Sequence, residues 1–158
     1  MHQEPISTAD LYDQHGDALQ SVSLQFQDFG GRLSFYGPAR TVKCHEDNGL
    51  VKEILNFPGN GAVLVVDGGA SLRYALMGDM IAESAEANGW AGVIISGAVR
   101  DRAALAELEL GIKALGSNPR KTVKRSHGSV DEAISIGDVN IRPGAMVYAD
   151  IDGILVEH

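Results

Sequence analysis

Cysteine is almost absent from this chain of 158 residues, because Cys44 is its only one. An intramolecular disulfide is therefore excluded, and so is a metal cluster held by several thiolates. Cys44 ends a strand-like stretch (residues 41–44), so we expect a half-buried, unreactive thiol, which is the usual state of a free cysteine. The histidines form no ligand spacing for zinc, and His127 stands alone in a loop.

Long apolar runs and an excess of basic residues are also missing. No apolar stretch approaches the ~18 residues needed to span a membrane, and the N-terminus does not have the pattern of a signal peptide. We therefore expect a cytoplasmic protein without membrane contact. The 13 Lys and Arg residues are outnumbered by 21 Asp and Glu, which gives a net charge of −8. This charge disfavours direct binding of nucleic acid but allows docking on a basic protein.

Glycine, by contrast, is abundant, with 19 residues that cluster at expected strand ends. The patterns predict helices over 7–19, 47–55, 79–88 and 102–108. Continuous apolar runs at 62–66 and 92–96 predict strands buried on both faces. Further strands are expected at 33–36 and 39–45, parted by Gly37-Pro38, at 112–115, and as four short strands over 133–156; residues 22–26 and 71–76 are ambiguous. We predict one mixed α/β domain over residues 1–158, with a β-rich C-terminal half.

The most informative residues are Asp79, Arg100 and Asp101. Asp79 lies in the segment Gly78–Ile81, which opens a helix, and Arg100-Asp101 follows an apolar strand just before the next helix. About twenty residues separate the two elements, the length of one helix plus one strand, so both can return to the same edge of a sheet. A carboxylate, a guanidinium and a second carboxylate would then suit a small anion held on a divalent metal.

Each of these residues also has a simpler interpretation. Free amides at Gly78–Ile81 can hold a carboxylate, or Asp79 can merely cap the helix. Arg100 can grip a carboxylate and stabilise an enolate oxygen, or form an ion pair with Asp79 or Asp101. Asp101 can be an oxygen ligand for Mg²⁺, or the cap of the following helix.

Two further patterns carry weaker signals. The stretch Asp67-Gly68-Gly69 lacks the glycine spacing of a dinucleotide site and the lysine of a P-loop, so it reads as a turn and gives little support to a methyltransferase or dehydrogenase. Four basic residues fall within six positions: Arg120, Lys121, Lys124 and Arg125. They form either a solvated loop or a functional element, which would be a lid or an anion-steering patch.

Several segments together resemble the RraA family, which includes regulators of ribonuclease E activity and class II 4-hydroxy-4-methyl-2-oxoglutarate aldolases. They are 29–32 (FGGR), 64–73 (LVVDGGASLR), 78–80 (GDM), 88–92 (NGWAG), 97–101 (GAVRD), 111–121 (GIKALGSNPRK) and 150–155 (DIDGIL). The resemblance implies an α/β/β sandwich like the phosphohistidine swivelling domain, assembled as a homotrimer with its active site at the subunit interface.

The resemblance also implies roles for individual residues. The segment Gly78, Asp79, Met80 and Ile81 would hold the pyruvyl part of a 2-oxo acid substrate. Arg100 would bind substrate and act in catalysis together with Asp79, and Asp101 would hold a divalent cation, Mg²⁺ or Mn²⁺. Longer aldolases of the family supply an acidic residue from an extra C-terminal segment, and no residue before His158 matches it.

This difference favours one reaction over another. Aldol cleavage of a tertiary alcohol needs a base for the hydroxyl proton. Decarboxylation of oxaloacetate does not, because loss of CO₂ leaves a pyruvate enolate that a metal and Arg100 can stabilise. The sequence therefore predicts a metal-dependent lyase that favours decarboxylation. The alternative is a binding protein that inhibits a ribonuclease E-type partner.

Overall fold

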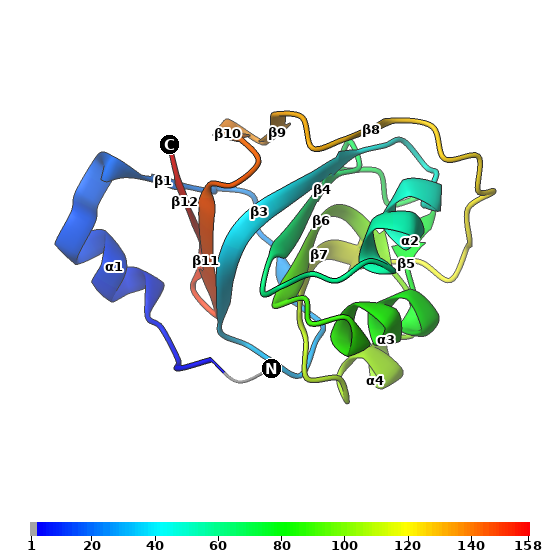
Figure 1. Cartoon of the computed structure of the whole chain (residues 1–158), viewed down its shortest axis with the longest axis horizontal. Helices are drawn as coiled ribbons and strands as arrows, with labels where there is room; N and C mark the ends of the chain where they lie inside the picture. The colour runs from blue at the N-terminus through cyan, green and yellow to red at the C-terminus, as the bar shows by residue number, and fades with distance from the viewer. Residues whose placement is uncertain (1–2) are drawn as a thin grey trace.

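The computed structural model describes residues 3–158, whose strands build one large mixed sheet with helices beside it (Figure 1). The sheet order is β1-β12-β11-β3-β4-β6-β7-β2, with β5 paired to β6 and β8 paired to β3. The strands of this sheet are β1 (Leu19–Ser21), β2 (Gln27–Asp28), β3 (Phe35–Lys43), β4 (Val63–Asp67), β5 (Ala75–Met77), β6 (Gly92–Val99), β7 (Gly111–Ser117), β8 (Ser129–Val130), β11 (Met146–Asp150) and β12 (Gly153–Glu157). A separate hairpin joins β9 (Ile134–Ile136) to β10 (Val139–Ile141).

Strand β3 connects the antiparallel part of the sheet to its parallel part. Its first half pairs antiparallel with β11, up to Pro38 opposite Met146, and its second half pairs parallel with β4, from Ala39 opposite Val63. The prediction that Gly37-Pro38 parts two strands is therefore wrong: one strand runs through, and the strand changes its neighbour at this point. A proline lacks the N–H of a regular ladder, which suits a place where one pairing ends and another begins.

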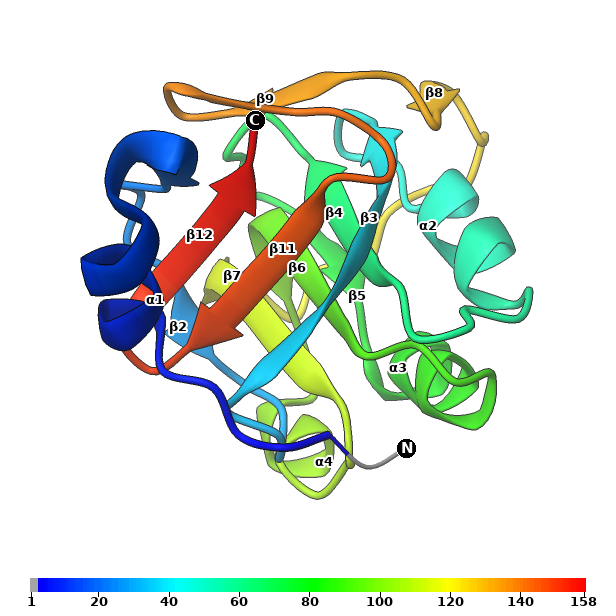
Figure 2. The ribbon, with the colours of Figure 1, turned by 60° about the vertical axis from the view of Figure 1, so that its left-hand side comes forward.

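Two hydrophobic cores lie on the two faces of the parallel strands. One core packs these strands against α2 (Gly49–Leu55), α3 (Asp79–Ala87) and α4 (Arg102–Leu105). The other core packs them against β11 and β12, which lie in front of β6 and β7 in Figure 2. Helix α1 (Thr8–His15) covers the far side of the antiparallel strands, at the opposite end of the molecule from α2 and α3. The helices beside the parallel strands thus all lie on one face.

The helices follow the predicted positions but are shorter. Helix α1 starts after Ser7, whose hydroxyl accepts a hydrogen bond from Asp10 N, and ends at His15 because Gly16 takes a positive φ of 55°. A short 3₁₀ turn (Gly16–Ala18) then replaces the predicted last turn of the helix. Helix α4 ends at Leu105 instead of residue 108. Within residues 3–158, no helix is long and apolar enough to cross a membrane.

The predicted mixed α/β class and the β-rich C-terminal half are confirmed, since β8 to β12 all follow residue 128. Residues 22–26 form no strand, and the ambiguous 71–76 segment yields β5 at Ala75–Met77. The likeness to the swivelling domain stays a prediction. So does the single domain over 1–158, whose first two residues lie outside the described part.

Cys44 lies between β3 and α2 and is buried instead of half-buried, with 6% of its surface exposed. Burial, assisted by the nearby carboxylates of Asp47 and Asp67, raises the pKa of its thiol to about 12. The thiolate is the reactive form of cysteine, so the structure agrees with an unreactive side chain.

Asp150, at the end of β11, anchors the start of α1. Its carboxylate accepts hydrogen bonds from Thr8 N (2.7 Å), Thr8 Oγ1 (2.6 Å) and Asp152 N (3.0 Å). Burial raises the pKa of Asp150, but these hydrogen bonds lower it by more, so the net pKa lies below the ordinary value. The charged form therefore stabilises the fold above the unfolded-state pKa, and this contribution is lost as the pH falls through the folded-state pKa.

We expect Asp150→Asn to lower the free energy of unfolding by about 2 kcal/mol at pH 7, the typical value of hydrogen bonds to a charged group. The difference between wild type and variant should shrink as the pH falls below the ordinary Asp pKa of about 3.9 and through the lowered folded-state pKa, where the wild-type carboxyl also becomes neutral. Urea unfolding of both proteins at pH 7 and pH 3 measures it. An equal difference at the two pH values would contradict the assigned role of the charge.

Candidate active site

The ends of β5 and β6 bring the predicted site residues together. The two strands are parallel neighbours, with Met77 opposite Val99, and Arg100 N donates a hydrogen bond to Met77 O at 3.0 Å. Gly78 follows β5 and precedes α3, while Arg100 and Asp101 follow β6 and precede α4. The sequence separation of Asp79 and Arg100 thus predicted the arrangement correctly: one helix and one strand return the chain to the same edge.

Asp101 faces the start of α3 instead of capping its own helix. Its Oδ2 accepts a hydrogen bond from Asp79 N at 2.9 Å, and its side chain makes no capping bond to α4. The backbone of Asp101 is left-handed, with φ 64° and ψ 44°. This conformation is uncommon for a residue with a side chain, and it turns the carboxylate toward the neighbouring strand end. The capping interpretation of Asp101 is therefore wrong.

The simpler interpretations of Asp79 and Arg100 fare differently. Asp79 does not cap α3, because Gly78 is the residue before the helix and Asp79 is its first residue. Arg100 does meet Asp101, but loosely: Nε and Oδ2 are 3.9 Å apart, and the side chains are 40% and 36% exposed. A surface pair of this kind contributes little to stability. Arg100 Nη1 also donates a long hydrogen bond to Pro119 O at 3.4 Å, and the remaining N–H groups of the guanidinium are available to a ligand.

Gly78 leaves the space that this arrangement needs. A Cβ at residue 78 would lie 2.6 Å from Asp101 Oδ2 and 3.2 Å from Arg100 Nε. Any side chain there would push the carboxylate or the guanidinium away. Gly78 thus allows both groups to approach the start of α3 closely.

A pocket of about 120 Å³ opens beside these residues. It is lined by Asn48, Lys52, Ala75, Gly78, Asp79, Met80, Ile81, Arg100, Lys121 and Lys124. Four of these are cations and one is a carboxylate. Within residues 3–158, no carboxylate lies within ion-pair distance of the three lysines, so their charge is available to an anion.

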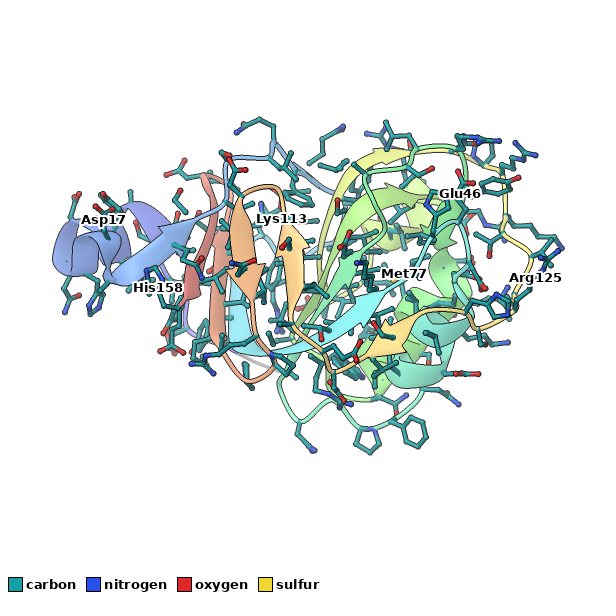
Figure 3. All side chains as sticks on the ribbon, turned by 90° about the horizontal axis from the view of Figure 1, so that it is seen from above. Asp17, Glu46, Met77, Lys113, Arg125 and His158 are labelled. Carbon is teal, nitrogen blue, oxygen red and sulfur yellow. The ribbon has the colours of Figure 1, made fainter. Side chains whose placement is uncertain are left out.

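The basic loop, which carries Arg120, Lys121, Lys124 and Arg125, has two parts with different surroundings. Lys121 and Lys124 line the pocket, while the Arg120 guanidinium lies 4.2 Å from the centre of the Tyr74 ring. Arg125 lies on the outermost bend of the loop (Figure 3). The position of Lys121 and Lys124 at the pocket favours the anion-steering prediction for these two lysines. Arg120 instead packs on Tyr74, which neither prediction for this segment included.

Sequence reasoning missed Asn48 and Lys52. Both belong to the first turns of the α2 region, which the chain places beside α3 and β5. A lysine on a short helix carries no signal of its own. Only the packing of α2 against the strand ends brings Lys52 to the pocket.

The residues present fit a divalent cation of a particular kind. No group of three or more His, Cys, Asp or Glu side chains in residues 3–158 could enclose a metal. Asp101 instead offers a half-exposed carboxylate with one oxygen engaged by Asp79 N. Mg²⁺ commonly takes one or two protein carboxylates and completes its shell with water and substrate, and Mn²⁺ also prefers such oxygen ligands.

Residues 8–156 match the family described as RraA-like, Aldolase/RraA, and the chain belongs to this family. A relative from Ectopseudomonas mendocina (strain ymp), named "Putative 4-hydroxy-4-methyl-2-oxoglutarate aldolase", is 50% identical over 149 residues, covering 94% of this chain and 92% of the relative.

Two solved structures are similar throughout. The Thermus thermophilis protein, described as the RNA-processing inhibitor RraA, is 42% identical with a TM-score of 0.93, covering 97% of this chain and 93% of its own. A Geobacillus kaustophilus HTA426 protein, described as an S-adenosylmethionine:2-dimethylmenaquinone methyltransferase, is 47% identical with a TM-score of 0.94. The match covers 96% of this chain and 94% of the Geobacillus chain. In the present chain, the Asp67 carboxylate accepts a hydrogen bond from Gly69 N at 3.0 Å, as expected of a turn.

Proposed function

We propose that this protein is a divalent-metal-dependent carbon–carbon lyase, acting on 2-oxo acids that yield a pyruvate enolate. The observation that carries the proposal is that Arg100 and the start of α3 line one cationic pocket, and that Asp101 lies against both of them. The relative named as an aldolase, at 50% identity, supports the same class of reaction.

The pocket suits a small acid in its shape and charge. The first amides of α3 have no partner within the helix, and the helix dipole favours an anion there. Arg100 lies beside them and can donate two parallel hydrogen bonds to a carboxylate or an enolate oxygen. The Asp79 amide is engaged by Asp101, so we assign the substrate carboxylate to the other amides of the Gly78–Ile81 segment. We assign the 2-oxo oxygen to Arg100 and an ordered water to the Asp79 carboxylate.

Decarboxylation of oxaloacetate needs the least from these residues. The bond between C3 and C4 breaks and CO₂ leaves. The electron pair of this bond moves through C2 to the oxo oxygen and forms the enolate. C3 then takes a proton from water to give pyruvate. Arg100 stabilises the oxygen as its charge develops, which is worth most in a site prepared in advance. Aldol cleavage additionally needs a base for the hydroxyl proton. We therefore expect decarboxylation to be the faster reaction.

Asp101 would hold the cation, Mg²⁺ or Mn²⁺. When bound, the cation supplies positive charge to the same developing oxygen and orients the 2-oxo acid. Asp79 N–H fixes one oxygen of the Asp101 carboxylate and thereby its direction. The same oxygen, Oδ2, lies 3.9 Å from Arg100 Nε, so the second oxygen has no protein partner among residues 3–158 and would be open to a cation.

We expect chelation of divalent metal to lower pyruvate release from oxaloacetate at least ~100-fold, because the cation would contribute several kcal/mol to the stability of the enolate. Adding Mg²⁺ or Mn²⁺ in excess should restore the rate. The assay couples pyruvate to lactate dehydrogenase and runs in parallel on 4-hydroxy-4-methyl-2-oxoglutarate. Metal without protein gives the background. An unchanged rate in chelator, or no release from either substrate above background, would overturn the proposal.

We further propose that the pocket is completed by a neighbouring subunit, as in the trimer implied by the family resemblance. Met80 lines the pocket and is 80% exposed, so a large apolar side chain stands in solvent at the mouth of the proposed site. A second copy packed on this surface would cover Met80 and close the pocket.

A second candidate function is inhibition of an RNA-degrading enzyme of the ribonuclease E type. It is favoured by the 42% identity to the Thermus protein described as an RNA-processing inhibitor. The net charge of −8 suits a basic partner surface and is unsuited to direct binding of RNA.

A further inference from the structure

A buried carboxylate, Asp47, holds the loop that carries the two pocket lysines. Asp47 is 6% exposed and precedes α2. Its oxygens accept hydrogen bonds from Arg125 N (3.1 Å), Ser126 N (3.3 Å) and His127 N (3.1 Å), and from Gly49 N (3.0 Å). Three successive backbone amides of one loop thus converge on one side chain.

The charge of Asp47 is stabilised by these bonds. Burial raises the pKa of its carboxyl, but the hydrogen bonds from Gly49, His127, Arg125 and Ser126 together lower it by more. The partners of Asp47 are backbone donors, so no amide side chain can replace the carboxylate fully. In either orientation, the NH₂ group of an asparagine would face an N–H.

A second contact holds the same loop a few residues earlier. Thr122 Oγ1 donates to Asn48 Oδ1 at 2.6 Å and accepts from Asn48 N at 3.2 Å, and both residues are buried. Lys121 directly precedes this anchor, and Lys124 lies between it and the anchor at residues 125–127. Each of the two lysines that line the pocket is therefore the immediate neighbour, in sequence, of a point at which the loop is held.

The anchors matter because this segment has little other regular structure. Lys121 makes one isolated bridge to Ala75, and no helix or strand lies between it and β8. Ordering a residue costs about 1–2 kcal/mol of conformational entropy, and lysine side chains add more. Asp47 and the Asn48–Thr122 pair offset this cost before a ligand arrives, so less binding energy is spent on ordering the loop.

We propose that Asp47 is a positioning residue: through the 125–127 amides, assisted by Asn48 and Thr122, it fixes Lys121 and Lys124 at the pocket and so sets its affinity for an anionic substrate. The substrate role rests on the proposed function, whereas the fixing of the loop does not.

Asp47→Asn should raise KM for oxaloacetate about tenfold while changing kcat less than about threefold, since it loosens binding groups and leaves Arg100 and Asp101 in place. The effect should vanish when Lys121→Ala and Lys124→Ala are already present, because non-additivity identifies residues that act through one another. Asp150→Asn is the matched control: it also removes a buried carboxylate that holds backbone amides, but at α1, and should leave KM unchanged. A KM increase of equal size with and without the lysines would overturn the proposal.

Tryptic cleavage tests the loop without relying on any activity. Cleavage after Lys121, Lys124 and Arg125 should be at least about fivefold faster in Asp47→Asn than in wild type or in Asp150→Asn, because cleavage follows local opening. Thr122→Val, which keeps the shape and removes the hydroxyl, should act in the same direction if Asp47→Asn does not fold. Faster cleavage without any pyruvate release from wild type would support the loop anchor and reject only the proposed function. Unchanged cleavage in both variants would overturn the anchor itself.

Discussion

Replacing Asp101 by asparagine should lower kcat/KM for pyruvate release from oxaloacetate at least ~100-fold, the usual cost of removing a group that stabilises charge in a transition state. Asparagine keeps the shape, can still accept the hydrogen bond from Asp79 N, and tolerates the left-handed backbone at this position. The change therefore removes a negative charge and little else. Initial rates over a range of Mg²⁺ concentrations measure the loss, and the concentration of Mg²⁺ at half-maximal rate should rise.

Asp131→Asn provides the matched control for this variant. Asp131 also has a left-handed backbone, with φ 57°, and also pairs with an arginine, since its carboxylate accepts two hydrogen bonds of 2.8 Å from Arg40. It does not line the pocket. Its replacement should leave kcat/KM within about twofold of wild type. An Asp101→Asn enzyme that matches wild type both in rate and in the Mg²⁺ concentration at half-maximal rate would refute the role of Asp101.

The juxtaposition of Asp79 with Arg100 and Asp101 was predictable because it depends on local rules. Parallel neighbouring strands end at the same edge, and the connecting helix has a length that sequence periodicity indicates. The direction of the Asp101 carboxylate was not predictable. It depends on one left-handed residue and on a hydrogen bond from the first residue of α3, 22 positions earlier.

The anchoring role of Asp47 was beyond sequence reasoning for a related reason. A polar residue before a helix is normally a cap, and Asp47 does bond to Gly49 N in that manner. Its remaining partners lie 78 to 80 positions away in the chain. No local pattern indicates which distant loop will bring its amides to such a carboxylate, so the contribution of the basic loop stayed open until the fold was known.

The continuous strand β3 shows the opposite kind of error, in which a local signal was present but was interpreted wrongly. Gly37-Pro38 is typical of a turn, yet the glycine is needed because residue 37 lies against the backbone of Gly61, with no space for a side chain. The sequence contained a signal at the correct position. What it marked was a change of partner strand and a close approach between segments, neither of which is local.

A close approach of the same kind leaves no space for a side chain at one glycine of the core, Gly111. Gly111 on β7 lies opposite Gly92 on β6, and the ring of Phe35, which is fully buried, covers both. A Cβ added at Gly111 would overlap three atoms of this ring. The ring belongs to the core between the two parts of the sheet, and its neighbours there are also buried, so it has no open space to enter.

Gly111→Ala should therefore lower the free energy of unfolding by about 3 kcal/mol, the upper end of the usual cost of overpacking. For a domain of this size, this corresponds to a decrease in Tm of about 6–12 °C.

Gly116→Ala is the matched control: it lies on the same strand and is also buried, but its added Cβ would meet Leu72 at an ordinary 3.4 Å, so Tm should change by less than about 2 °C. Adding Phe35→Leu to Gly111→Ala should cost less than the two single changes together, because the smaller side chain leaves room for the new methyl group. Strict additivity, or equal effects at 111 and 116, would show that the Phe35 ring does not fix the spacing of β6 and β7.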